Sequence, residues 1–160
     1  MTAKKQTPGN LSFIPEIRIK VEMKRGKEYD EAKGISNPQD MANVMRTMFD
    51  QGKINWVEEC VMLCLNQANK VVGYHRISSG GVTASVMDVR VIATVALTNC
   101  ATSVAIAHNH PSGNLTPSEP DKQITRKLRD GLRLLDIQLL DHLIITDNGY
   151  FSFAEEGYFL

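Results

Sequence analysis

Residues 103–121 read SVAIAHNHPSGNLTPSEPD and combine a strand, a polar turn and the start of a helix. Residues 103–107 form a short apolar run of strand length that leads directly into His108. Because side chains alternate along an extended chain, His108 and His110 are expected to project from one face of the sheet. This is the spacing of two metal ligands, so the end of this strand is a candidate metal site.

The residues after the turn predict a helix over about 117–135. Thr116 fits the N-cap of this helix, and Glu119 fits the position of its capping-box partner. The alternative is Ser118 as the N-cap, with Asp121 as its partner. The helix is expected to bury an apolar stripe formed by Ile124, Leu128, Leu132 and Leu135.

Asp121 connects this helix with the two histidines. It lies three residues after Ser118, on the same helix face, and it continues into the apolar stripe. An unpaired carboxylate buried there is costly, whereas a cation shared with His108 and His110 removes the cost. Two histidines and one carboxylate leave the fourth tetrahedral position of Zn²⁺ open, as in catalytic zinc sites. A histidine pair of this spacing is weak evidence by itself, so the prediction depends on all three residues together.

The composition restricts the classes of partner. The chain has 160 residues, enough for one domain, with 18 basic and 18 acidic side chains and a formal net charge of zero. We therefore expect no strong direct binding to nucleic acid and no attraction to an anionic membrane. Three cysteines without a C-x-x-C pair, and the lack of an apolar run of membrane-spanning length, favour a reduced, soluble, cytoplasmic protein.

The remaining sequence predicts helices and strands in one mixed arrangement. Further strands are expected at 14–23, 60–65, 71–77, 82–86, 138–146 and 150–153. Further helices are expected from the Asn37-Pro38 start to near Gly52, and over 88–97 with Asp88 as N-cap. The pattern indicates an α/β or mixed α+β domain with a mixed sheet flanked by helices. Trp56 and three methionines, at 41, 45 and 48, are expected in the core.

These residues resemble a known family. His108-x-His110, seven further residues, Ser118, two residues and Asp121 is similar to the JAMM signature of the JAB/MPN metalloproteases. More narrowly, residues 106–114 (IAHNHPSGN), 140–145 (LDHLII) and 149–153 (GYFSF) resemble the RadC family, whose members have long been labelled DNA repair proteins.

The resemblance covers about 56–159. The polar composition of residues 1–10, with Pro8 and Gly9, predicts a flexible leader. Residues 11–55 are expected to supply an N-terminal strand and helix that pack on the domain, and the resemblance implies a JAB/MPN-like metal-binding core at 56–160. Longer RadC proteins carry an N-terminal helix-hairpin-helix module, and residues 1–55 do not resemble one, which weakens the case for direct DNA binding.

The resemblance also implies roles for individual residues. His108, His110 and Asp121 would hold a zinc ion, a serine at the position of Ser118 would stabilise an oxyanion, and an upstream glutamate would act as general base. His75 and His142 are expected to be packed or hydrogen-bonded rather than ligands, and His142 follows the family pattern without an assigned role.

Two glutamates precede the strand at 60–65, and only one can face the site. Family members carry their acid two residues before the first large apolar residue of this strand, a position held here by Cys60, which favours Glu58. A slip of one residue in the strand register would select Glu59 instead.

Three functions follow from the resemblance. The first is a zinc-dependent JAMM-type peptidase or isopeptidase. The second is a non-catalytic MPN-like interaction module in DNA repair or mobile-element biology. A metal-dependent nuclease is a third, which the neutral charge disfavours.

Overall fold

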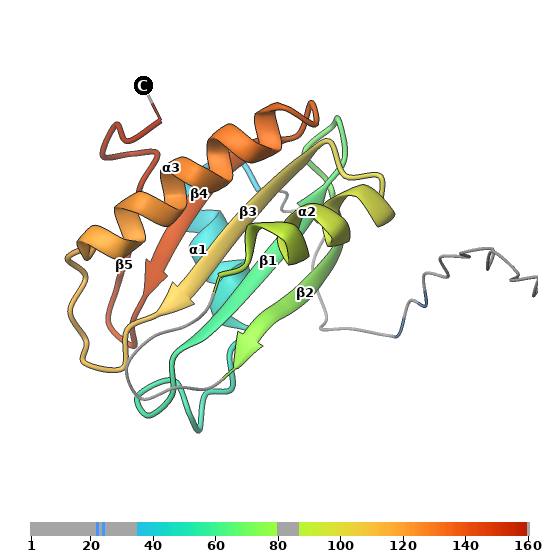
Figure 1. Cartoon of the computed structure of the whole chain (residues 1–160). Helices are drawn as coiled ribbons and strands as arrows, with labels where there is room; N and C mark the ends of the chain where they lie inside the picture. The colour runs from blue at the N-terminus through green and yellow to red at the C-terminus, as the bar shows by residue number, and fades with distance from the viewer. Residues whose placement is uncertain (1–21, 23, 25–34, 80–86, 160) are drawn as a thin grey trace, which may run out of the picture.

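The structure is a computed structural model that describes residues 22, 24, 35–79 and 87–159. Within this part of the chain, one five-stranded mixed sheet carries helices on both faces (Figure 1). The strands are β1 (Glu59–Leu65), β2 (Val71–Ser79), β3 (Ser103–Asn109), β4 (Gln138–Ile145) and β5 (Tyr150–Ser152). The helices are α1 (Pro38–Arg46), α2 (Val89–Thr98) and α3 (Glu119–Arg133). The predicted mixed α+β fold is confirmed.

The topology brings the end of β3 close to the start of α3. The strand order is β2-β1-β3-β4-β5; β3 and β4 are parallel, and every other neighbouring pair is antiparallel. Parallel neighbours need a crossover connection, which is usually a helix, and α3 is that helix here. It begins shortly after the carboxyl end of β3 and runs back across the sheet. Side chains from the carboxyl end of β3 and from the first turn of α3 therefore meet at one end of the sheet.

Strand β1 explains why residues 60–65 form an unbroken apolar run. Cys60, Met62 and Cys64 face the core that also contains residues of α2 and α3. Val61, Leu63 and Leu65 face the core under α1. A strand buried on both faces has no polar side and loses the alternation of a half-exposed strand.

The first two helices begin where the sequence predicts. The Asn37 side chain accepts a hydrogen bond from the Asp40 amide, and the Asp88 side chain accepts one from the Arg90 amide. Helix α1 ends at Arg46, earlier than the expected end near Gly52. The three predicted core methionines are buried, but Trp56 is 77% exposed, because it lies in the turn region before β1 and not on a strand.

The start of α3 differs from the first interpretation. Ser118 is the N-cap and Asp121 closes the capping box, so the assignment of Thr116 as N-cap was wrong and the alternative is correct. The Thr116 amide instead donates to the Asn114 side chain in the preceding turn. Since the helix ends at Arg133, Leu135 lies beyond it and is 41% exposed, whereas the rest of the stripe is buried or half-buried.

Several expectations lie outside the described residues. These are the leader at 1–10, nearly all of the strand at 14–23, and the segment at 82–86.

Candidate metal centre

Three side chains from two elements converge at the carboxyl end of β3. His108 lies within β3, where it is paired with Cys60 of β1 and Ile144 of β4. His110 follows the strand, and its amide donates to the carbonyl of Ile145. Asp121 is in the first turn of α3. Two backbone ladders and a capped helix thus fix the three predicted ligands before any metal binds.

The distances between the candidate ligand atoms suit a tetrahedral ion. His108 Nε2 is 3.0 Å from His110 Nε2 and 3.4 Å from Asp121 Oδ1. His110 Nε2 is 3.7 Å from Asp121 Oδ2. A tetrahedral zinc ion with bonds of 2.0–2.1 Å holds its ligand atoms roughly 3.3 Å apart. The measured distances lie around this value, but the two to Asp121 involve different carboxylate oxygens; with one atom from each side chain, the three candidate ligand atoms lie within 4.8 Å of one another, close enough to share one ion.

Hydrogen bonds orient two of these ligands. His110 Nδ1 lies 2.6 Å from the carbonyl oxygen of Asn114, which can only accept, so Nδ1 carries the proton and Nε2 presents its lone pair. The backbone amide and hydroxyl of Ser118 donate to Asp121 Oδ2 over 2.7 and 2.5 Å. Asp121 Oδ1 is the carboxylate oxygen nearer to His108. Lone pairs that converge at such short distances repel each other unless a cation lies between them.

Burial keeps the innermost imidazoles neutral. It lowers the pKa of His108 to about 4, and this effect outweighs the carboxylate of Asp121, which acts in the opposite direction. Burial, with the neighbouring imidazoles of His108 and His110, also lowers the pKa of His142 well below its usual value. A neutral imidazole is the form that binds a metal.

The strand register separates the two candidate glutamates. Cys60 lies opposite His108, so by strand alternation Glu58, which directly precedes β1, falls on the His108 face, and Glu59, the first residue of β1, falls on the other face. Burial, and to a smaller extent the charge of Glu58, raises the pKa of the Cys60 thiol.

Glu59 already has partners on the opposite face. Glu59 is 3% exposed. Its carboxylate forms an ion pair with Arg76 at 2.5 Å and accepts a hydrogen bond from Ser79 Oγ. The register therefore favours Glu58 as the general base, and this role stays a prediction.

Two residues without a predicted role extend the centre. His142 Nε2 lies 2.8 Å from His108 Nδ1, and His142 Nδ1 lies 2.6 Å from Thr125 Oγ1. Thr125 Oγ1 in turn donates to the carbonyl of Asp121. The sequence contained one indication that Thr125 is part of the centre, because it lies four residues after Asp121 on the same helix face. His75 is exposed on β2 and is not part of the cluster.

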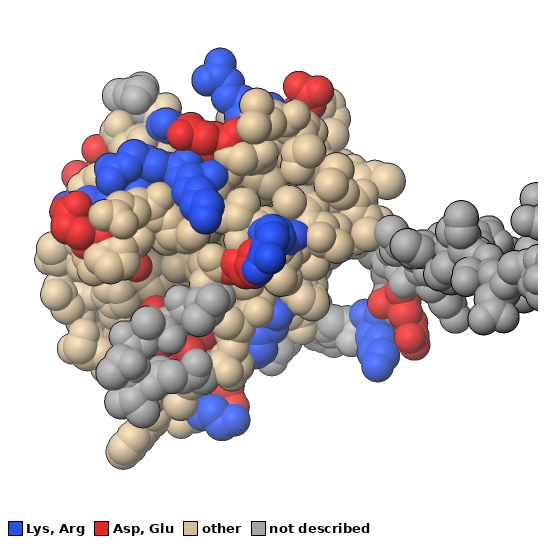
Figure 2. Space-filling view, in the orientation of Figure 1, with Lys and Arg blue, Asp and Glu red and all other residues tan. Residues whose placement is uncertain are grey.

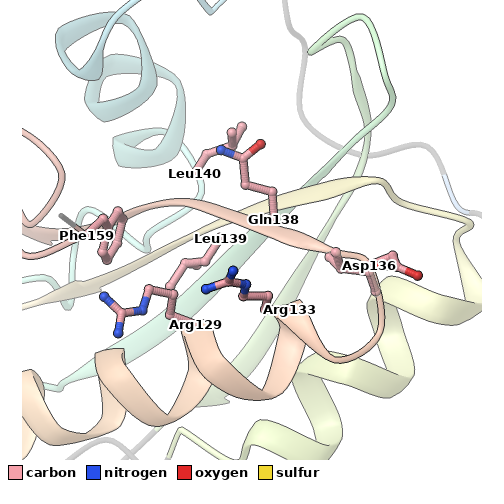
Figure 3. A pocket seen from close by; sticks show the side chains of 8 residues that line it. Arg129, Arg133, Asp136, Gln138, Leu139, Leu140 and Phe159 are labelled. Atoms are coloured by element: carbon pink, nitrogen blue, oxygen red, sulfur yellow. The ribbon is translucent and has the colours of Figure 1, made fainter.

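A separate pocket lies at the far end of α3. It has a volume of about 430 Å³, and Arg129 and Arg133 extend from α3 toward β4 and Phe159 (Figure 3). At 1.5 Å per residue, these arginines are roughly 12–18 Å along the helix from Asp121. Figure 2 shows Lys and Arg side chains gathered over α3, interspersed with acidic ones. The pocket contains none of the predicted site residues.

Comparison with known proteins identifies the family. The model of the RadC-like JAB domain matches residues 35–158. This chain belongs to the RadC-like JAB domain family. The match includes α1 and so extends further toward the N-terminus than the resemblance described above.

RadC-family relatives occur in several bacteria. A UPF0758 protein of Flavobacterium johnsoniae is 40% identical over 135 residues, which cover 84% of this chain and 58% of the relative. A UPF0758 protein of Porphyromonas gingivalis is 46% identical over 101 residues, covering 62% and 44%. The UPF0758 protein YfjY of Escherichia coli K12 is 42% identical over 100 residues, covering 62% of each chain. The chain thus spans about half the length of the first two relatives.

In the described part of this RadC-family chain, no helix is both long and apolar enough to cross a membrane.

Proposed function

We propose that this RadC-family chain is a zinc-dependent metallohydrolase of the JAMM type that cleaves peptide or isopeptide bonds. The observation that carries the proposal is the convergence of His108, His110 and Asp121, whose ligand atoms all lie within 4.8 Å of one another. His110 and Asp121 are not completely buried, so a substrate can reach the outer side of the centre. A closed structural zinc site would use a fourth protein ligand, and the described residues near these three supply none.

The side chains around a bound zinc ion would have different roles in the reaction. A bound zinc ion would supply Lewis acidity, which lowers the pKa of a water molecule and polarises a carbonyl oxygen. Glu58, on the His108 face, would take the proton of the attacking water and pass it to the leaving amine. The burial of His108 excludes bulk water from the inner side of the centre.

Ser118 can serve both the helix and the reaction. Its amide and its hydroxyl both donate to Asp121 Oδ2. When the hydroxyl turns toward a substrate, the amide still donates to the carboxylate, which is then held by one donor instead of two. The hydroxyl would then donate to the oxyanion that develops on the carbonyl.

The proposed setting follows from the chemistry of the chain. Cys60, Cys64 and Cys100 are free thiols, as expected in the reducing cytoplasm. The proposed partner is a peptide or isopeptide substrate. Strong direct binding to nucleic acid is not part of the proposal, because the net charge is zero.

The test combines metal content with turnover of fluorogenic peptide and isopeptide substrates. We expect close to one zinc ion per chain in the wild type and none in His110→Ala. Glu58→Gln should keep the zinc and lose turnover. Glu59→Gln is the comparison variant: it should keep zinc but lower stability, since it breaks the ion pair with Arg76.

The possible outcomes separate the candidate functions. Unchanged turnover in Glu58→Gln would contradict the assignment of the general base. Zinc binding without turnover on any substrate, or no bound zinc in the wild type, would favour the non-catalytic interaction module.

A further inference from the structure

A chain of three hydrogen bonds links the ligand on β3 with the ligand on α3. It runs from His108 Nδ1 to His142 Nε2 over 2.8 Å, from His142 Nδ1 to Thr125 Oγ1 over 2.6 Å, and from Thr125 Oγ1 to the Asp121 carbonyl over 2.6 Å. His108 and His142 are completely inaccessible to solvent and Thr125 is nearly so. Water therefore cannot replace any of these partners.

The carbonyl acceptor at the end of this series of hydrogen bonds determines which atom carries the proton in each bond. The carbonyl oxygen of Asp121 can only accept, so the hydroxyl proton of Thr125 points to it. The lone pairs of Thr125 Oγ1 then face His142 Nδ1, which must carry a proton. In a neutral ring this leaves His142 Nε2 without a proton, and Nε2 can accept from His108 Nδ1. His108 Nε2 is consequently the bare nitrogen, directed at His110 and Asp121.

We infer that His142 is a positioning residue of the metal centre, which holds His108 in the tautomer and orientation that present Nε2 to the ion. The inference rests on the proposed metal site and adds a role for two side chains, His142 and Thr125, that do not touch the ion. Because this series of hydrogen bonds ends on the backbone carbonyl of Asp121, it also fixes the position of the start of α3 relative to β3. A group that fixes the tautomer of a ligand histidine raises metal affinity without binding metal itself.

The surroundings of His142 hold its ring in one orientation. Phe153 stacks on it with ring centroids 4.7 Å apart and an interplanar angle of 6°. The His142 amide donates to Asp141 Oδ1 over 2.7 Å. The imidazole thus has one rotamer, in which both nitrogens have partners.

The first test measures zinc affinity by competition with a chromophoric chelator. His142→Phe keeps the flat ring beside Phe153 but removes both nitrogens, and it should weaken zinc binding roughly 10–100-fold. His142→Gln, which retains an acceptor for His108, should recover much of the loss. Thr125→Val should weaken binding, and Thr125→Ser should restore it. Thermal unfolding of the metal-free variants reports any structural effect separately.

A purely structural role would give another pattern. The variants would then unfold at lower temperature without metal, yet the folded protein would bind zinc with wild-type affinity. That result in His142→Phe, or in Thr125→Val if the former does not fold, would overturn the inference. Wild-type protein that binds no zinc would instead contradict the proposed function.

The second test needs no variant and no metal. Long-range ¹H–¹⁵N NMR of the metal-free wild type should show the neutral Nδ1–H tautomer for both His108 and His142. A proton on Nε2 of His142 would overturn the inference.

Discussion

Asn109 lies between the two candidate histidine ligands in sequence, and its side chain points to the opposite face of the sheet. Its Oδ1 accepts from the Glu59 amide over 2.7 Å, and its Nδ2 donates to the carbonyls of Ile54 and Val57 over 2.6 and 2.9 Å. One buried side chain thereby fixes the segment that carries Glu58. Side chains alternate between the two faces of the sheet at the end of β3. His108 therefore faces the candidate metal centre, and Asn109 binds the neighbouring loop on the other face.

Asn109→Ala should therefore reduce both stability and turnover while zinc remains bound. It leaves one amide and two carbonyl groups without their partner, which we expect to cost at least about 2 kcal/mol in the free energy of unfolding. Asn66→Ala is the control, because Asn66 makes similar bonds in an exposed turn. Urea unfolding, zinc content and turnover test this; loss of zinc from folded Asn109→Ala would show that the interpretation is wrong.

Asp141 makes stability depend on pH. Burial raises the pKa of this carboxyl from 3.8 to about 6, although hydrogen bonds from Ser152, Ala154 and His142 act against the rise. Between these values the folded protein holds the proton and the unfolded chain does not. Lowering the pH from 7 to 4 therefore favours the folded state, and the gain is present in full below about pH 4.

The comparison with Asp141→Asn isolates this effect, because asparagine does not titrate. We expect the metal-free wild type to gain stability relative to the variant as the pH falls from 7 to 4, by at most about 3 kcal/mol. Urea unfolding at a series of pH values measures the difference. A difference that stays constant, or that shrinks as the pH falls, would contradict the assignment.

At the scale of elements, α3 brings Asp121 to the two histidines of the candidate metal centre. Its N-cap, Ser118, binds the same carboxylate that faces the histidines, so the capping box also orients a ligand. The rest of the helix presents its buried residues, such as Leu128 and Leu132, to the sheet. Helix packing and ligand position are therefore set together.

Ser118→Ala should lower the free energy of unfolding by about 1 kcal/mol and also weaken zinc binding. Asn37→Ala is the matched control, because it removes the N-cap of α1 on the other face of the sheet. It should cost a similar amount of stability and leave zinc affinity unchanged. Equal zinc affinity in the two variants would show that the capping box does not orient Asp121.

At the scale of the whole molecule, a metal ion bound at the proposed site would link strand β3 to the helix that follows it. An ion bound by His108, His110 and Asp121 exists only when β3 and α3 are packed, so it stabilises the folded state alone. The far end of α3, with Arg129 and Arg133 at its pocket, is separate from this linkage.

Zinc should therefore raise the unfolding temperature of the wild type. At free zinc one hundred times its dissociation constant, the stabilisation is about 2.7 kcal/mol, on the order of 5–10 °C for a chain of this length. His110→Ala should show no such rise. Differential scanning calorimetry with and without a chelator measures it, and an equal rise in the variant would point to zinc bound elsewhere.

The sequence by itself determined most of the local structure and the identity of the candidate ligands. Strand and helix periodicities and the caps at Asn37 and Asp88 depend on residues a few positions apart, and His108, His110 and Asp121 lie within one stretch of 14 residues. The choice of Glu58 over Glu59 as the general base came only from the family resemblance, and it stays a prediction.

Only the tertiary structure decided the remaining features. The sequence left Thr116 and Ser118 as alternative caps, and the fold selected Ser118, whose box partner faces the histidines. Trp56, expected in the core, is exposed because none of the described elements covers its turn. The contact of His142 with His108 joins residues 34 positions apart on parallel strands. Such contacts depend on strand register and on the path of α3 across the sheet, and no pattern within a short stretch of sequence encodes them.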